Sequence, residues 1–203
     1  MKKTGLFLLI TILMISCYSS PDKELDQAKK YKEKINKYEL KKYAEKENDL
    51  ADKAYDDAAK IMTPKSSFNN GKAKKSLDSA NANYKTVYEK GITTLTDDES
   101  KKTKEEVDSA NQIKANVAVK AAYDEALALY NQALAAKESK DYEKSIDLFR
   151  DAKIKFEDAV KIAKEKKVKA DDSLNSTLED KKALEEDSKK VDESSDVKDD
   201  TQQ

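Results

Sequence analysis

Histidine and tryptophan are absent from this 203-residue chain, and cysteine occurs once, at Cys17. Without histidine and with a single thiol, the chain cannot build a zinc site from imidazole or thiolate ligands. The same shortage excludes a Ser-His-Asp or Cys-His catalytic centre. One cysteine also excludes an internal disulfide, so an exported form of this chain must hold its fold by packing alone.

Loop-forming residues are scarce as well. The chain has three glycines and two prolines, and neither type follows Gly91. Enzymes usually bind substrate in a concave site, and so few loop residues give little means of building one. The acidic doublets lack the alternating ligands of a calcium loop, so we interpret them as solvated charge. We expect a protein that is not an enzyme and has no metal, cofactor or small-molecule substrate.

Charge is abundant but balanced. The chain has 40 basic and 41 acidic residues, Arg150 is its single arginine, and the two signs alternate along most of its length. A nucleic-acid surface needs a basic face, so no nucleic-acid partner is expected. With 40% charged and 37% hydrophobic residues, the composition suits long helices that each bury a narrow stripe.

The most informative segment is the N-terminus. Lys2 and Lys3 precede an apolar run from residue 6 to residue 15, which ends at Ser16 and Cys17. This order is typical of a secretory signal peptide. A run of about ten apolar residues is roughly half of what a helix needs to cross the bilayer. We therefore predict a signal peptide over residues 1–16 and no permanent membrane span there.

The residues around the predicted cleavage site, Leu13-Met14-Ile15-Ser16-Cys17, resemble the lipobox of bacterial lipoproteins, in the looser form of spirochaetes. The resemblance implies that Cys17 is diacylated and becomes the new N-terminus, with residues 17–21 as a lipidated tether. Two or more acyl chains hold a protein durably on a bilayer. The expected location is the cell membrane or the outer membrane, with the domain in the periplasm or on the cell surface. An ordinary signal peptide with a chance cysteine, or an uncleaved anchor, remains the alternative.

Apolar residues at steps of three or four predict an all-helical domain over residues 22–167. Asp22 is the predicted N-cap of a helix, or of two helices end to end, that reaches residue 61. Pro64 should stop that helix, and Asn-Gly at residues 70–71 should reverse the chain. The next helix should end at Gly91 as a C-terminal cap, which gives a first hairpin over residues 40–91.

A second hairpin is predicted over residues 119–167. Thr96 and Glu99 match a capping box, so a third helix should start there and run to about residue 137. A fourth helix should begin at Tyr142. After residue 168 the apolar residues thin out among charged ones, and we predict that the tail 168–203 is largely disordered, with a weak helix to about residue 184.

The two hairpins echo each other, as in Tyr55-Asp56-Asp57-Ala58 and Tyr130-Asn131-Gln132-Ala133. Residues 126–164 resemble a tetratricopeptide repeat, because Asp141-Tyr142-Glu143-Lys144 matches the turn of that family and Ser145, Phe149 and Ala152 match its second helix. Two departures are the small Ala136 in place of a bulky aromatic and Glu157 in place of the terminal proline, so the helix should overrun by two or three turns. A plain helical bundle or antiparallel coiled coil explains the same pattern.

The tetratricopeptide resemblance implies a protein-binding surface, for which Tyr130, Tyr142 and Phe149 are the candidate contacts. Nine tyrosines at helical spacing suggest half-buried seams, with the ring inside and the hydroxyl at the rim. We therefore expect a membrane-anchored lipoprotein with a non-enzymatic protein-binding or scaffold role in the cell envelope. The alternative function is a surface-exposed structural or host-contact antigen.

Overall fold

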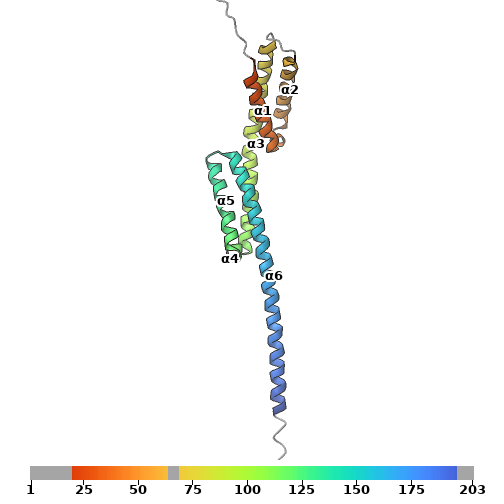
Figure 1. The fold of residues 1–203 in the computed structure, drawn as a ribbon, viewed down its shortest axis with the longest axis vertical. Helices are drawn as coiled ribbons and strands as arrows, with labels where there is room; N and C mark the ends of the chain where they lie inside the picture. The colour runs from red at the N-terminus through yellow and green to blue at the C-terminus, as the bar shows by residue number, and fades with distance from the viewer. Residues whose placement is uncertain (1–19, 64–68, 196–203) are drawn as a thin grey trace, which may run out of the picture. The chain divides into compact units, whose positions relative to one another are not determined.

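The structure is a computed structural model that describes residues 20–63 and 69–195, the last five by backbone alone. No strand occurs in these ranges, so the predicted all-α fold is confirmed. The elements are α1 (Asp22–Lys37), the 3-10 turn η1 (Leu40–Tyr43), α2 (Glu45–Met62), α3 (Asn70–Gln112), α4 (Ala115–Ala118), α5 (Lys120–Glu138) and α6 (Tyr142–Ser195), labelled in Figure 1.

The chain divides into two compact units at Thr94 and Leu95. Unit 1 contains α1, η1, α2 and the part of α3 up to Thr94, and unit 2 contains the rest of α3 with α4, α5 and α6. Both predicted hairpins are present, α2 with α3 and α5 with α6. Each has a third helical segment packed against it, so the packing unit has three helices instead of two.

Unit 1 is an up-down-up bundle. Lys32 of α1 pairs with Asp52 of α2 at 3.0 Å, and Tyr84 of α3 donates to the same carboxylate. Lys90 of α3 pairs with Glu47 of α2. Since Asp52, later in α2, contacts Tyr84, earlier in α3, the two helices are antiparallel. The interior is built from small and medium residues at helical spacing: Ala28, Ile35, Leu40, Ala51, Ala58, Ala73, Leu77, Ala80, Tyr84 and Val87.

The prediction of one helix, or of two helices end to end, from residue 22 to residue 61 is wrong. The chain reverses between Tyr38 and Ala44, so α1 and α2 lie antiparallel, and Glu39 takes a left-handed conformation with φ 54°. Tyr38 and Leu40 are at most 2% exposed, and burying both requires the fold-back. At the start of α1, Pro21 occupies the N-cap position and no side chain caps it, so the Asp22 cap is also wrong.

The break predicted between Gly91 and Thr96 is absent, because α3 runs unbroken from Asn70 to Gln112. Gly91 lies inside the helix, where a Cβ would come within 2.8 Å of the Leu40 Cβ. Thr96 and Glu99 are buried helix residues, not a capping box. The helix predicted to reach residue 137 instead ends at Gln112, and Lys114 reverses the chain with φ 60°.

Unit 2 contains the second hairpin. Ser145 of α6 donates to the carbonyl oxygen of Ala133 in α5 at 2.9 Å, and Lys155 pairs with Glu125 at 2.8 Å, so the two helices are antiparallel. Edge-on packing of Tyr123 on Phe156, with ring centroids 5.6 Å apart, fills the interior near α4. The core cluster there comprises Val107, Ala110, Ala115, Val119, Tyr123, Ala126, Phe156, Ala159 and Ala163.

The same turn recurs in the two units. A left-handed residue, Glu39 or Lys114, is followed by a four-residue helical turn and then by Ala44 or Val119 in a similar backbone conformation (φ −157°, ψ 58° and φ −140°, ψ 49°). Positions 39 and 114 differ by 75, the same offset that separates the echoed segments at Tyr55 and Tyr130. The repeat seen in the sequence therefore extends to the turn before each hairpin.

Helix α6 continues to Ser195, past the weak helix predicted to about residue 184, so the predicted disorder is wrong for residues 185–195. From residue 164 onward this helix has no buried residue among those whose exposure is described. Lys, Glu, Ala and Leu have high helix propensity, and the segment has no glycine or proline to end the helix. Pairs such as Lys181 with Glu185 add i,i+4 support. Residues 196–203 lie outside the described part.

Candidate functional site

The predicted lipidation site lies outside the described residues. Cys17 and the signal peptide over residues 1–16 precede the first described position, Ser20. Helix α1 begins at Asp22, five residues after Cys17. Five residues of fully extended chain span at most about 18 Å. Any lipid on Cys17 would therefore hold the start of α1 within that distance of its attachment point.

The three predicted contact residues do not form one surface. Phe149 is fully buried, so a partner cannot reach it, and its assignment as a contact is wrong. The Tyr130 ring lies 5.8 Å from the Phe149 ring and is half-buried, and Tyr142 is half-buried at the start of α6. Phe149 occupies the central face of α6, where an aromatic ring fills space between helices. The resemblance of Phe149 to an aromatic position of the repeat family does not say whether that position is in the core or on the surface.

The tyrosine series behaves as predicted. All nine tyrosines are buried or half-buried, and several hydroxyls have polar partners at the edge of the core. Tyr84 donates to Asp52 at 2.6 Å, and Tyr123 donates to Asn111 at 2.7 Å. Lysines cover some of the ring faces, as Lys32 does over Tyr55 at 5.1 Å. These contacts stabilise packing and form no binding platform.

The tightest polar cluster of unit 1 surrounds Asp52. It accepts hydrogen bonds from Tyr84 and from Asn48, whose Nδ2 lies 2.8 Å away, and pairs with Lys32. Burial acts to raise the pKa of Asp52, but the hydrogen bonds from Tyr84 and Lys32 outweigh it and hold the pKa below its usual value. Burial, and then the Asp52 charge, raise the pKa of Tyr84 far above its usual value. Both groups keep one protonation state near neutral pH, which suits a structural role.

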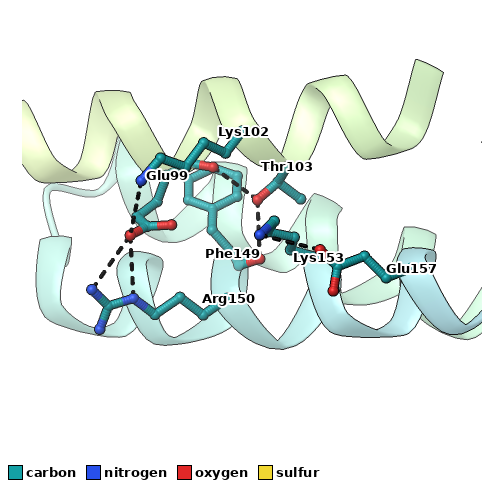
Figure 2. Close-up of polar contacts among 7 residues, drawn as sticks. All are labelled: Glu99, Lys102, Thr103, Phe149, Arg150, Lys153 and Glu157. Carbon is teal, nitrogen blue, oxygen red and sulfur yellow. Dashed lines mark hydrogen bonds and ion pairs between the residues drawn. The ribbon is translucent and has the colours of Figure 1, made fainter. Parts of the chain in front are cut away.

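Unit 2 has a second polar cluster, between the C-terminal part of α3 and α6 (Figure 2). Glu99 is 8% exposed and accepts from Arg150, with Nε and Nη2 at 3.3 and 3.4 Å from one carboxylate oxygen. The Thr103 hydroxyl is buried between two carbonyl oxygens, 2.8 Å from that of Glu99 and 3.0 Å from that of Phe149. The positive charge of Arg150 thus neutralises the almost buried carboxylate of Glu99. Without such a partner, a buried charge would strongly destabilise the fold.

A depression of about 250 Å³ lies at the α5–α6 turn, lined by Gln132, Ala135, Ala136, Ser139, Asp141 and Lys144. It lacks a nucleophile with an adjacent base, so we assign it no chemistry. In the described residues no group of three or more acidic or cysteine side chains is placed to hold a metal ion.

Sequence reasoning missed one exposed helical surface. The α6 extension, defined here as residues 164–190, exposes Leu174, Leu178 and Leu184 by 59%, 48% and 71%. The sparse apolar residues of this segment suggested disorder. The signal that could have revealed it is a seven-residue spacing that continues from the buried residues of α6.

Comparisons with known proteins do not identify a family: no protein-family model, curated protein or solved structure matches this chain. Across the helices that the structure describes, none combines the length and apolar character that a bilayer crossing requires.

Proposed function

We propose that this chain is a bacterial lipoprotein, moored to a membrane through Cys17, with a non-enzymatic protein-binding or scaffold role in the cell envelope. The lipobox-like residues 13–17 support the mooring, together with the short span between Cys17 and α1. The single observation that supports the binding role is the α6 extension, a helix with exposed leucines at residues 174, 178 and 184. Exposed apolar side chains of this kind mark interaction surfaces.

The mooring is tested by mass spectrometry of the N-terminal peptide of protein purified from the cell that makes it. For the wild type we expect a peptide that begins at Cys17 and has the added mass of acyl chains. For the Cys17→Ser variant we expect a chain that retains residues 1–16. A peptide that begins at Met1, or a mature chain with a free thiol at Cys17, would refute the lipoprotein assignment.

The alternative function is a surface-exposed structural or host-contact antigen, and the same helix favours it as a charged stalk. Brief protease treatment of intact cells separates the two. Loss of the α6 extension from intact cells would support surface display, while protection until the envelope is opened would support a role inside it.

A further inference from the structure

The α6 extension is unpartnered beyond its first residues: near its start the Lys166 ammonium donates to the Ala118 carbonyl oxygen of α4 at 3.0 Å. Within unit 2, Figure 1 shows no other helix beside the blue part of α6, and all residues of the extension are exposed. At 1.5 Å per residue it is about 40 Å long. A lone helix of this length gains no tertiary packing, although packing of an apolar stripe supplies most of the stability of helices in proteins.

The face of α6 that forms the core of unit 2 continues into the extension. Phe149, Phe156 and Ala163 recur every seven residues and are at most 4% exposed. The next residues at this spacing are Ala170, Thr177 and Leu184, with Leu174 and Lys181 between them, and we call these five residues the seam. A stripe that repeats every 3.5 residues is the pattern of a coiled coil.

The charges that flank the seam determine which partner fits. Lys164 and Lys166 flank its start, and Asp180, Glu185 and Asp187 flank its end. In a parallel pair, Asp180 of one chain would face Glu185 of the other, five positions on, and the like charges would repel. An antiparallel pair instead places the basic start of one helix against the acidic end of the other.

We propose that the α6 extension pairs with the α6 extension of a second copy of this chain as an antiparallel coiled coil, with the two-fold axis between Asn175 and Ser176. In this register Lys166 faces Asp187 of the second copy and Lys164 faces Glu185, and symmetry forms each pair twice. No like charges meet along the flanks. Leu174 meets Thr177, and Leu184 packs on the aliphatic stem of Lys167.

This pairing is expected to be weak and reversible, since two lysines enter the seam and the flanking ion pairs are exposed. Within one chain Glu185 lies 3.9 Å from Lys181, Asp187 lies 3.4 Å from Lys190, and the Lys166 ammonium lies 3.0 Å from the Ala118 carbonyl oxygen. Pairing would replace or share these contacts. The inference deepens the protein-binding role proposed above by naming the partner. It does not depend on the lipid, so it can fail while the mooring holds, and the reverse is also true.

The first test is sedimentation velocity on the chain from Tyr18 to Gln203, which includes every described residue and has no thiol. We expect a concentration-dependent dimer, and Leu174→Gln should weaken the association at least tenfold. Val168→Gln is the matched control, because Val168 is also 59% exposed but lies outside the seam. A monomer at all concentrations up to several hundred micromolar, or equal losses in the two variants, would overturn the proposal.

Orientation is tested by disulfide trapping. Ser173 of one chain should lie opposite Asp180 of the other, so a mixture of Ser173→Cys and Asp180→Cys chains should form mainly the mixed disulfide. A parallel pair would place Ser173 beside Leu178 of the other chain, so the absence of a preference for the mixed disulfide would contradict the proposed geometry. As a charge test, Lys166→Glu should weaken the dimer, and adding Asp187→Lys to the same chain should restore it.

Discussion

At the scale of single residues, Gly91 shows how a small side chain can be required inside a helix. It lies in the middle of α3, where alanine would normally be favoured by about 1 kcal/mol. Its missing side chain lets the Leu40 turn approach, since a Cβ at residue 91 would come within 2.8 Å of the Leu40 Cβ. Glycine was read from the sequence as a helix end because that is its commoner use.

Gly91→Ala should therefore destabilise the protein. Leu40 is fully buried, and a Cβ atom next to the backbone cannot move aside, so overpacking of about 1–3 kcal/mol should exceed the gain in helix propensity. Urea denaturation followed by circular dichroism measures the change. Ser79→Ala on the exposed side of α3 is the control and should be neutral or slightly stabilising. A Gly91→Ala protein more stable than the wild type would show that the close approach is absent.

Asp52 gives a prediction about pH. Its folded pKa is lowered, so its ionised form stabilises the fold above the ordinary pKa of an aspartate, and this contribution is lost as the pH falls through the folded value. Asp52→Asn should cost about 1–2 kcal/mol at pH 7, because Tyr84 and Lys32 lose a charged acceptor.

The comparison of wild type and Asp52→Asn should be made by urea denaturation at several pH values. The stability gap should be constant from pH 7 to about pH 5 and should shrink as the pH falls through the ordinary aspartate range near 4. It should close below the lowered folded pKa, where the Asp52 carboxyl is protonated. A gap that stays constant down to pH 2.5 would mean that the charge of Asp52 contributes nothing. Tyr84→Phe should reduce the gap, because it removes one of the hydrogen bonds to the carboxylate.

At the scale of elements, the left-handed residues decide where helices turn back. Glu39, Lys114 and Lys140 have φ values of 54°, 60° and 62°, and each ends a helix or precedes a new one. Such positions favour glycine, since other residues there bring Cβ close to the backbone. Positions 39 and 114 are instead glutamate and lysine, which are common inside helices. The sequence therefore contained no sign of a turn at either position.

Lys114→Gly should stabilise the protein by up to about 1 kcal/mol, as relief of the left-handed strain exceeds the entropy that glycine adds to the unfolded chain. The measurement is the midpoint of thermal or urea denaturation. Lys161→Gly, at an exposed position inside α6, should lower the midpoint, because glycine in a helix interior costs about 1 kcal/mol. If both variants lower stability equally, the left-handed turn at residue 114 is wrong.

The α6 extension should be dispensable for the stability of unit 2. The extension has no buried residue. A chain that ends at Lys169 should therefore have an unfolding free energy within about 0.5 kcal/mol of the wild-type value. Both chains should be compared by urea denaturation at concentrations where they are monomeric. Helical circular dichroism should fall in proportion to the residues removed. A large loss of stability would indicate that the extension packs against the domain in solution.

At the scale of the whole molecule, the prediction of an all-helical protein followed from composition and spacing. The stripes at residues 73–88 and 142–163 lie in α3 and α6, and the stripe at residues 25–61 covers α1 and α2, which a turn separates. The tyrosine seams were also predictable, because an aromatic ring with a polar tip suits the edge of a thin core. The lipid anchor at Cys17 is a prediction of the sequence that awaits its test.

The sequence by itself determined which segments are helical and which face of most helices is apolar, because these properties depend on local spacing and propensity. Only the tertiary structure decided where those helices reverse and which aromatic residues are covered. Helix α3 passes through Gly91 because Leu40 packs there, and Phe149 is core because Tyr130 and Thr103 close over it. Those outcomes depend on contacts between residues far apart in the chain, which no local pattern contains.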